Sequence, residues 1–256
     1  MHMTPLGSEL TAGGIQGGLA LALAAPFVLA ATLHSRTRRW RLLFATGFLV
    51  LLSFVLTRLP RVDGFRNHSW AWQETLLLIA FFFLLAVVTP GISLATFGVT
   101  SHLRPGSLKP AIPALALAVL IPFVFFALGA RKTLGAEGWI YLSLMPGLAE
   151  ELVFRGVFQS LLNQVFGKPW SFANAEFGWS LPITTLLFAA ANGLLEVDSQ
   201  LHPHVSLVRG IAPLASGLIA GWVRERTDSI WPSAVGHNLF NLVIPLGSVL
   251  LKAVQS

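Results

Sequence analysis

The sequence predicts an all-α fold, namely a polytopic integral membrane protein built as a bundle of about eight transmembrane helices. The chain has 256 residues, of which 54% are hydrophobic and only 11% are charged, whereas a soluble domain carries about 25% charged residues. Apolar runs that approach the ~20 residues needed to cross a bilayer recur along the whole chain. A soluble protein with a single membrane anchor does not fit this pattern.

Long apolar runs place the first four predicted spans at 15–33, 42–58, 75–99 and 111–130. The first run follows "MHMTPLGSEL", which lacks the basic segment that opens a signal peptide. Its positive charges come afterwards, in "SRTRRWR" (35–41). We therefore expect an uncleaved first span with its N-terminus outside, because Lys and Arg concentrate in cytoplasmic loops.

Four further runs place the remaining spans at 139–163, 181–195, 206–223 and 230–251. The two longest links, 59–74 and 167–180, are rich in Trp, a residue typical of the membrane interface. Prolines inside spans predict kinks or short breaks. These prolines are Pro90, Pro122, Pro146 and Pro213.

The formal net charge of +6 resides largely in short links. No basic stretch is interleaved with aromatic residues in the manner of RNA-binding proteins, so we expect contacts with the lipid bilayer and no nucleic-acid partner. The chain contains no cysteine. Disulfides, thiolate nucleophiles and zinc–thiolate sites are thereby excluded. We expect no cofactor.

Polar residues occur near the middle of three predicted spans: Glu150 in the fifth, Asn192 in the sixth, and His237 and Asn241 in the eighth. Polar and ionisable groups inside a membrane are costly and are functional candidates by default. Because these four lie at a similar depth, we expect them to share one polar cavity formed by the three spans.

Spacing within the helices separates the roles of two adjacent glutamates. Glu151 and Arg155 stand at i and i+4, so they share a helix face and can pair. Glu150 points about 100° away and is free to address a cavity. His237 and Asn241, also i and i+4, present two hydrogen-bond donors to one place. A buried glutamate with two donors suits attack of water on a carbonyl, with Glu150 as general base and an oxyanion held by the donors.

The motifs "EELVFR" (150–155) and "HNLFN" (237–241) resemble the EExxxR and HxxxN motifs of the CAAX prenyl protease and bacteriocin-processing (CPBP, or ABI) family of intramembrane glutamic endopeptidases. The likeness covers about residues 139–245. It implies a single transmembrane domain over 1–256, with N-terminal spans in 1–138 and a catalytic core in 139–251.

The resemblance also implies a role for each matching residue. Glu150 would activate water, Glu151 and Arg155 would form a supporting pair, and His237 and Asn241 would form the oxyanion site. The family's middle motif, FxxxH, aligns with "FAAAN" (188–192), where Phe188 matches but Asn192 stands in place of histidine.

Three explanations of Asn192 stay open at this stage. Glu150 acts as the sole base while Asn192 positions the water, since an amide cannot accept its proton. Alternatively, His202 or His204 folds back as a substitute. In the third, the chain is an inactive form, natural or engineered. A metal-dependent mechanism is less favoured, because there is no HExxH motif and the membrane site offers one histidine.

The expected function is therefore hydrolysis of a peptide bond in a membrane-associated protein or peptide substrate, such as a C-terminal tail or anchor that is removed during protein sorting. The expected location is the inner membrane of a bacterial cell. An inactive family member acting in binding, maturation or bacteriocin immunity is the alternative. A small transporter with Glu150 as a proton site is a third hypothesis, although no repeated half is visible.

Overall fold

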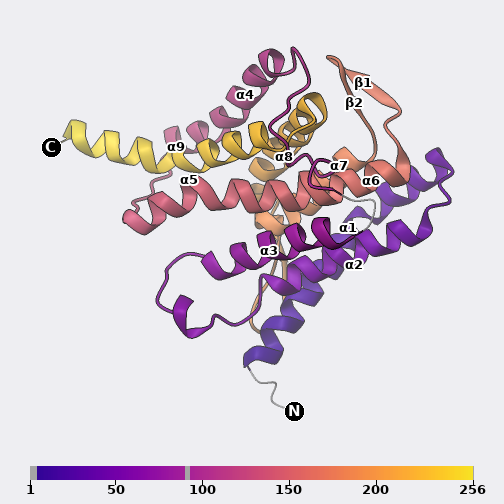
Figure 1. Ribbon diagram of the computed structural model, residues 1–256. Coiled ribbons are helices and arrows are strands. Elements are labelled where there is room, and N and C mark those ends of the chain that lie inside the picture. Colours follow the sequence, from indigo (N-terminus) through magenta and orange to yellow (C-terminus); the bar gives the residue numbers. More distant parts are fainter. Residues whose placement is uncertain (1–4, 90–92, 256) are drawn as a thin grey trace.

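The structure is a computed structural model that describes residues 5–89 and 93–255, and it consists mostly of helices (Figure 1). The α-helices are α1 (Pro5–Ser35), α2 (Trp40–Leu56), α3 (Trp72–Val88), α4 (Leu108–Ala127), α5 (Ala136–Glu150), α6 (Gln159–Phe166), α7 (Ser180–Ala189), α8 (Leu207–Thr227) and α9 (Trp231–Gln255). A short 3₁₀ segment, η1 (Asp63–Phe65), lies between α2 and α3. Two π-helical segments, η2 (Glu151–Phe158) and η3 (Ala190–Leu194), continue α5 and α7.

Among the described residues, three helices are long and apolar enough to cross a bilayer: Leu6–Ser35, Leu108–Ala127 and Trp231–Gln255. Shorter apolar helices lie at Trp40–Leu56, Trp72–Val88 and Ser180–Leu194. The predicted helical class is thus confirmed, whereas a total of about eight spans stays a prediction.

One boundary of the predicted spans is wrong. The third span does not extend to residue 99, because α3 ends at Val88 and Thr89 is extended, with φ −89° and ψ 115°. A residue that precedes proline is disfavoured in the α region, although Pro90 itself lies outside the described residues. The helices continue through Pro122, Pro146 and Pro213.

The fold is also not purely helical, because two links form antiparallel hairpins. β1 (Trp170–Phe172) pairs with β2 (Ala175–Phe177), and β3 (Leu195–Val197) pairs with β4 (Pro203–Val205). The turn of the first hairpin places Ala173 and Asn174 at φ 49° and 61°. Positive φ at both central residues is the geometry of a tight two-residue hairpin turn, which apolar periodicity does not reveal.

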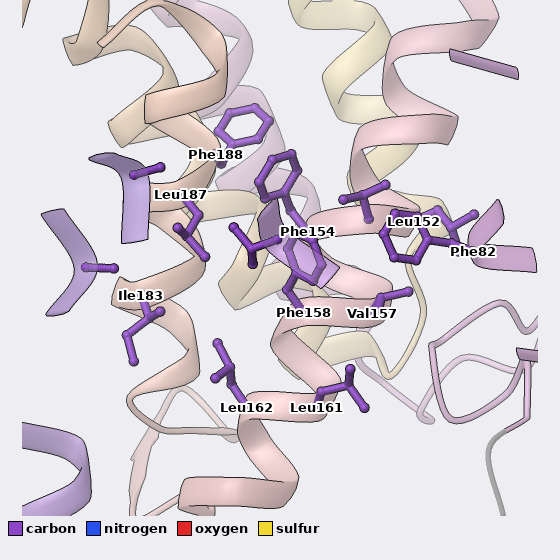
Figure 2. Close-up of a cluster of buried hydrophobic side chains, with 14 of the residues drawn as sticks. Phe82, Leu152, Phe154, Val157, Phe158, Leu161, Leu162, Ile183, Leu187 and Phe188 are labelled. Atoms are coloured by element: carbon purple, nitrogen blue, oxygen red, sulfur yellow. The ribbon is translucent and has the colours of Figure 1, made fainter. Parts of the chain in front are cut away.

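The core lies where η2 packs against α3 and α7, and it is rich in phenylalanine (Figure 2). Phe154 meets Phe158 and Phe188 edge to face, with ring centroids 5.6 and 5.4 Å apart. Phe82 of α3 meets Phe158 in the same way at 5.7 Å. Such pairs fix ring orientation as well as burying area, so the core holds the π-helical segment in one place.

The outer faces of the helices are apolar, as α4 illustrates. Ile112, Leu117, Leu120, Phe123 and Val124 are each more than half exposed along this helix. Monomeric soluble proteins rarely expose contiguous apolar patches of this kind. When these residues face lipid, they expose no apolar surface to water, so the exposed patch has no cost. In Figure 1, α5 and α9 run side by side, and this contact brings the two conspicuous motifs together.

Candidate active site

Glu151 and Arg155 form a buried ion pair at the start of the π-helical segment η2. Arg155 Nε lies 3.3 Å from Glu151 Oε2, and the two side chains are 1% and 0% exposed. Arg155 Nη2 also donates to the carbonyl oxygen of Gly217 on α8 at 3.2 Å. A charge with this little solvent requires a partner, so each side chain holds the other in position.

His237 of α9 contacts this pair from the opposite side. Its Nδ1 lies 3.0 Å from Glu151 Oε1. A carboxylate paired with Arg155 is ionised and only accepts hydrogen bonds, so Nδ1 carries the proton. Nε2 then donates only when the ring is an imidazolium.

Phe188 of α7 contacts both Arg155 and His237. The guanidinium carbon of Arg155 lies 4.1 Å from the centroid of its ring, and the ring of His237 meets it edge-on at 5.7 Å. Contact of a guanidinium with an aromatic face is favourable, more so away from water. Phe188 therefore orients both side chains by packing.

Asn192 hydrogen-bonds directly to Glu150. Its Nδ2 donates to Glu150 Oε2 at 2.8 Å and lies 3.1 Å from the carbonyl oxygen of Phe188. Helix α7 unwinds at this point, since Asn192 has φ −113° and Gly193 has φ 115°. The positive φ suits glycine. The π-helical end of the helix thus directs the Asn192 amide towards the carboxylate.

The four predicted site residues border two adjoining cavities, rather than the single cavity expected. His237 and Asn241 line a cavity of about 610 Å³, together with Glu151 and residues of α4 and α8. Glu150 lines a second cavity of about 540 Å³, together with residues of α1, α2 and α3. Asn192 lines both. Its side chain therefore stands at the boundary between Glu150 and the His237 side.

Asn238 is a contact residue that the motif comparison missed, because the HxxxN pattern leaves its position unspecified. Its Oδ1 accepts from the Gly147 N–H at 2.8 Å, and its Nδ2 lies 3.4 Å from the Leu144 carbonyl oxygen. These two groups lie on either side of Pro146 in α5. Gly147 allows the close approach, since a Cβ there would collide with the Ala234 carbonyl oxygen. Asn238 thereby ties the helix of His237 to the turn that precedes both glutamates.

His202 and His204 lie around Asp198 in the β3–β4 hairpin. His204 Nε2 is 3.1 Å from Asp198 Oδ2, and His202 Nδ1 is 3.6 Å from the same oxygen. The His202 backbone N–H and the His204 side chain hold the pKa of the Asp198 carboxyl below its usual value. His204 also borders the cavity of Glu150, but both histidines are more than half exposed. Among the described residues, no three His, Cys, Asp or Glu side chains are grouped so that they could hold a metal ion.

Comparison with known proteins places part of this chain in a family. Residues 133–243 match the family model described as type II CAAX prenyl endopeptidase Rce1-like. No curated protein and no solved structure matches the chain. The matched segment contains both glutamates, Asn192, His237 and Asn241, and the family is one of membrane proteases. The resemblance seen in the motifs is confirmed, because residues 133–243 match the Rce1-like CAAX protease model, which is a model of the CPBP family.

Proposed function

We propose that the protein is an intramembrane glutamic endopeptidase that hydrolyses a peptide bond of a membrane-associated protein or peptide. The observation that carries the proposal is the position of Asn192, which binds Glu150 on one side and borders the cavity of His237 and Asn241 on the other. A carbonyl placed beside Asn192 would have the base on one face and the donors on the other.

In the proposed reaction, Glu150 takes a proton from water as the water oxygen attacks the carbonyl carbon. Glu150 Oε1 makes no hydrogen bond to the described residues, whereas Oε2 accepts from Asn192, so Oε1 is available for the water. Asn241 Nδ2 and the Nε2–H of the His237 imidazolium would donate to the oxyanion, in the manner of other such sites. When the C–N bond breaks, the Glu150 proton passes to the departing amine.

The lining of the 610 Å³ cavity also favours a class of substrate. The 610 Å³ cavity is lined by apolar side chains of α4, α8 and α9, including Leu115, Phe125 and Phe240. A C-terminal tail or anchor segment of an exported membrane protein, processed during protein sorting, suits such a wall. The proposed setting is a multi-pass protein with about eight spans in a bacterial inner membrane.

A second candidate is an inactive family member that acts in binding, maturation or bacteriocin immunity. The observation that favours it is again Asn192, which stands where the family has histidine and already occupies one oxygen of Glu150. An amide cannot take up a proton in the useful pH range. Any activity therefore depends on Glu150 alone for the base.

The test compares cleavage of tail peptides in bilayers by the unaltered chain, Glu150→Gln and Asn192→His. We expect the unaltered chain to cleave and Glu150→Gln to lose about 10²-fold or more, the usual contribution of a general base. Glu176→Gln, on the exposed β2 strand, is the matched control and should cleave normally.

Two outcomes would count against the protease. Cleavage that survives Glu150→Gln contradicts the glutamate mechanism. Cleavage by Asn192→His alone identifies the native chain as an inactive family member.

A further inference from the structure

The N-terminal helices form one wall of the cavity that contains Glu150, although they lie outside the family match at 133–243. Their contribution to this 540 Å³ cavity includes a group of polar side chains, from Ser53 of α2, Thr57 directly after α2, and Glu74 and Thr75 of α3. Polar side chains in membrane helices usually face the bundle interior or a water-filled cavity. The outer faces of the same helices are apolar, so the polar side chains are concentrated on the side that faces the cavity.

The hydrogen bonds of this wall leave one strong acceptor without a protein partner. Glu74 Oε1 accepts from Arg61 Nε at 2.9 Å. Glu74 Oε2 is buried and has no partner among the described residues. A buried carboxylate oxygen rarely goes without a hydrogen bond. A polar cavity of this size has ample room for water that would satisfy it.

The cavity reaches the surface at the β3–β4 hairpin. Asp198 and His204, which are 39% and 58% exposed, lie on its lining. Arg58 fastens this end, since its Nη2 lies 3.0 Å from Gln16 Oε1 and 3.3 Å from the Val197 carbonyl oxygen. The cavity therefore runs from an exposed, charged hairpin to the carboxylate of Glu150.

We propose that this cavity is a hydrated vestibule through which water reaches Glu150, on the opposite side of Asn192 from the cavity that receives the substrate. Its catalytic purpose rests on the proposed protease function. In this arrangement the N-terminal helices are more than an anchor. They form the aqueous wall that keeps Glu150 supplied with water while an apolar substrate fills the other cavity.

The absence of cysteine from the chain makes the vestibule directly testable. Ser53→Cys places a thiol on the α2 wall. Two control variants on the same helix are Val50→Cys, in the core at 1% exposure, and Phe48→Cys, on the outer face at 63% exposure. Each variant is reconstituted in nanodiscs and treated with a charged thiol reagent that does not enter lipid.

We expect Ser53→Cys to react about tenfold faster than either control or more, because the reactive thiolate forms readily only where water is present. A rate equal to that of Val50→Cys would overturn the vestibule. A faster reaction at Phe48→Cys than at Ser53→Cys would mean that the outer face of α2 is more accessible to water than the cavity. This result would also overturn the proposed vestibule.

Cleavage by Ser53→Cys before and after modification separates this inference from the proposed function. Fast labelling with loss of cleavage supports both. Fast labelling of a chain that never cleaves, even with Asn192→His, supports the vestibule and contradicts the protease. Slow labelling in a chain that cleaves contradicts the vestibule alone.

Discussion

The N-terminal helices and the family-matched segment use charge in opposite ways. In residues 5–127 the ion pairs lie at helix ends and links, as with Arg66 and Asp63, which are 68% and 90% exposed. In residues 133–243 the pair Glu151–Arg155 lies in the core with 1% exposure or less. The comparison teaches that this fully buried ion pair lies where three helical segments, η2, α8 and α9, supply partners at once.

Helix geometry differs between the same two regions. The described helices of the N-terminal part are α-helical except for the short η1, whereas α5 and α7 both pass into π-helical segments at the site. A π-helical turn contains an additional residue and turns the following side chains relative to a regular helix, and such turns often occur at functional sites. Here they bring Asn192 to Glu150 and Glu151 to His237.

The largest expected effect comes from breaking the buried pair. Glu151→Leu leaves the Arg155 guanidinium without its carboxylate and should lower the free energy of unfolding by about 3–5 kcal/mol. Asp63→Asn breaks the exposed ion pair with Arg66 and should change the free energy of unfolding by about 0–1 kcal/mol. Denaturant titrations in detergent measure both. Equal losses would remove the distinction between the two regions.

The next largest difference in stability is expected between two glycine-to-alanine variants, one in each region. Gly147→Ala forces a methyl group against the Ala234 carbonyl oxygen and should destabilise the protein by about 1–3 kcal/mol. Gly18→Ala on α1 meets nothing within 4 Å, so it should be neutral or stabilise the helix by up to about 1 kcal/mol. Thermal unfolding tests both variants, and a stable Gly147→Ala protein would show that α5 and α9 are less closely packed.

Asn238→Ala tests whether the contact of α9 with α5 positions the site. Losing its bond to the Gly147 N–H should cost about 1–2 kcal/mol. Ser248→Ala is the matched control, because it removes another hydrogen bond of α9, in which Ser248 Oγ accepts from the Lys132 backbone N–H at 3.0 Å. We expect both variants to lose stability and only Asn238→Ala to lose kcat strongly. A similar loss of kcat in both variants would indicate general loosening of α9.

The smallest effect concerns pH at the β3–β4 hairpin. The lowered pKa of Asp198 means that its carboxylate is favoured by the folded hairpin. Its contribution is complete above the ordinary Asp value of about 3.9 and disappears as pH falls through the lowered pKa. The protection of the His202 amide against hydrogen exchange, relative to an unfolded peptide at the same pH, should therefore decrease on strong acidification. In Asp198→Asn this protection should be low at all pH values, and unchanged protection would contradict the carboxylate's role.

The resemblance to known motifs selected the candidate residues, and local periodicity explains why it could. Glu151 and Arg155 are four residues apart, so any helix places them on one face. The partner of His237 was not predictable in this way. Whether its ring meets Glu150 or Glu151 depends on how α9 is rotated against α5, and neither segment encodes that rotation alone. Asn238 was missed because the HxxxN pattern leaves its position unspecified.

The sequence by itself determined the helical class, the family resemblance of residues 133–243 and the spacing of the polar groups within their helices, because hydropathy, spacing and motifs are properties of short segments. Only the tertiary structure decided that His237 pairs with Glu151, that Asn192 stands between two cavities, and that α1 to α3 line the one containing Glu150. Those features arise from contacts between distant helices, whose relative rotation is set by packing of the whole bundle.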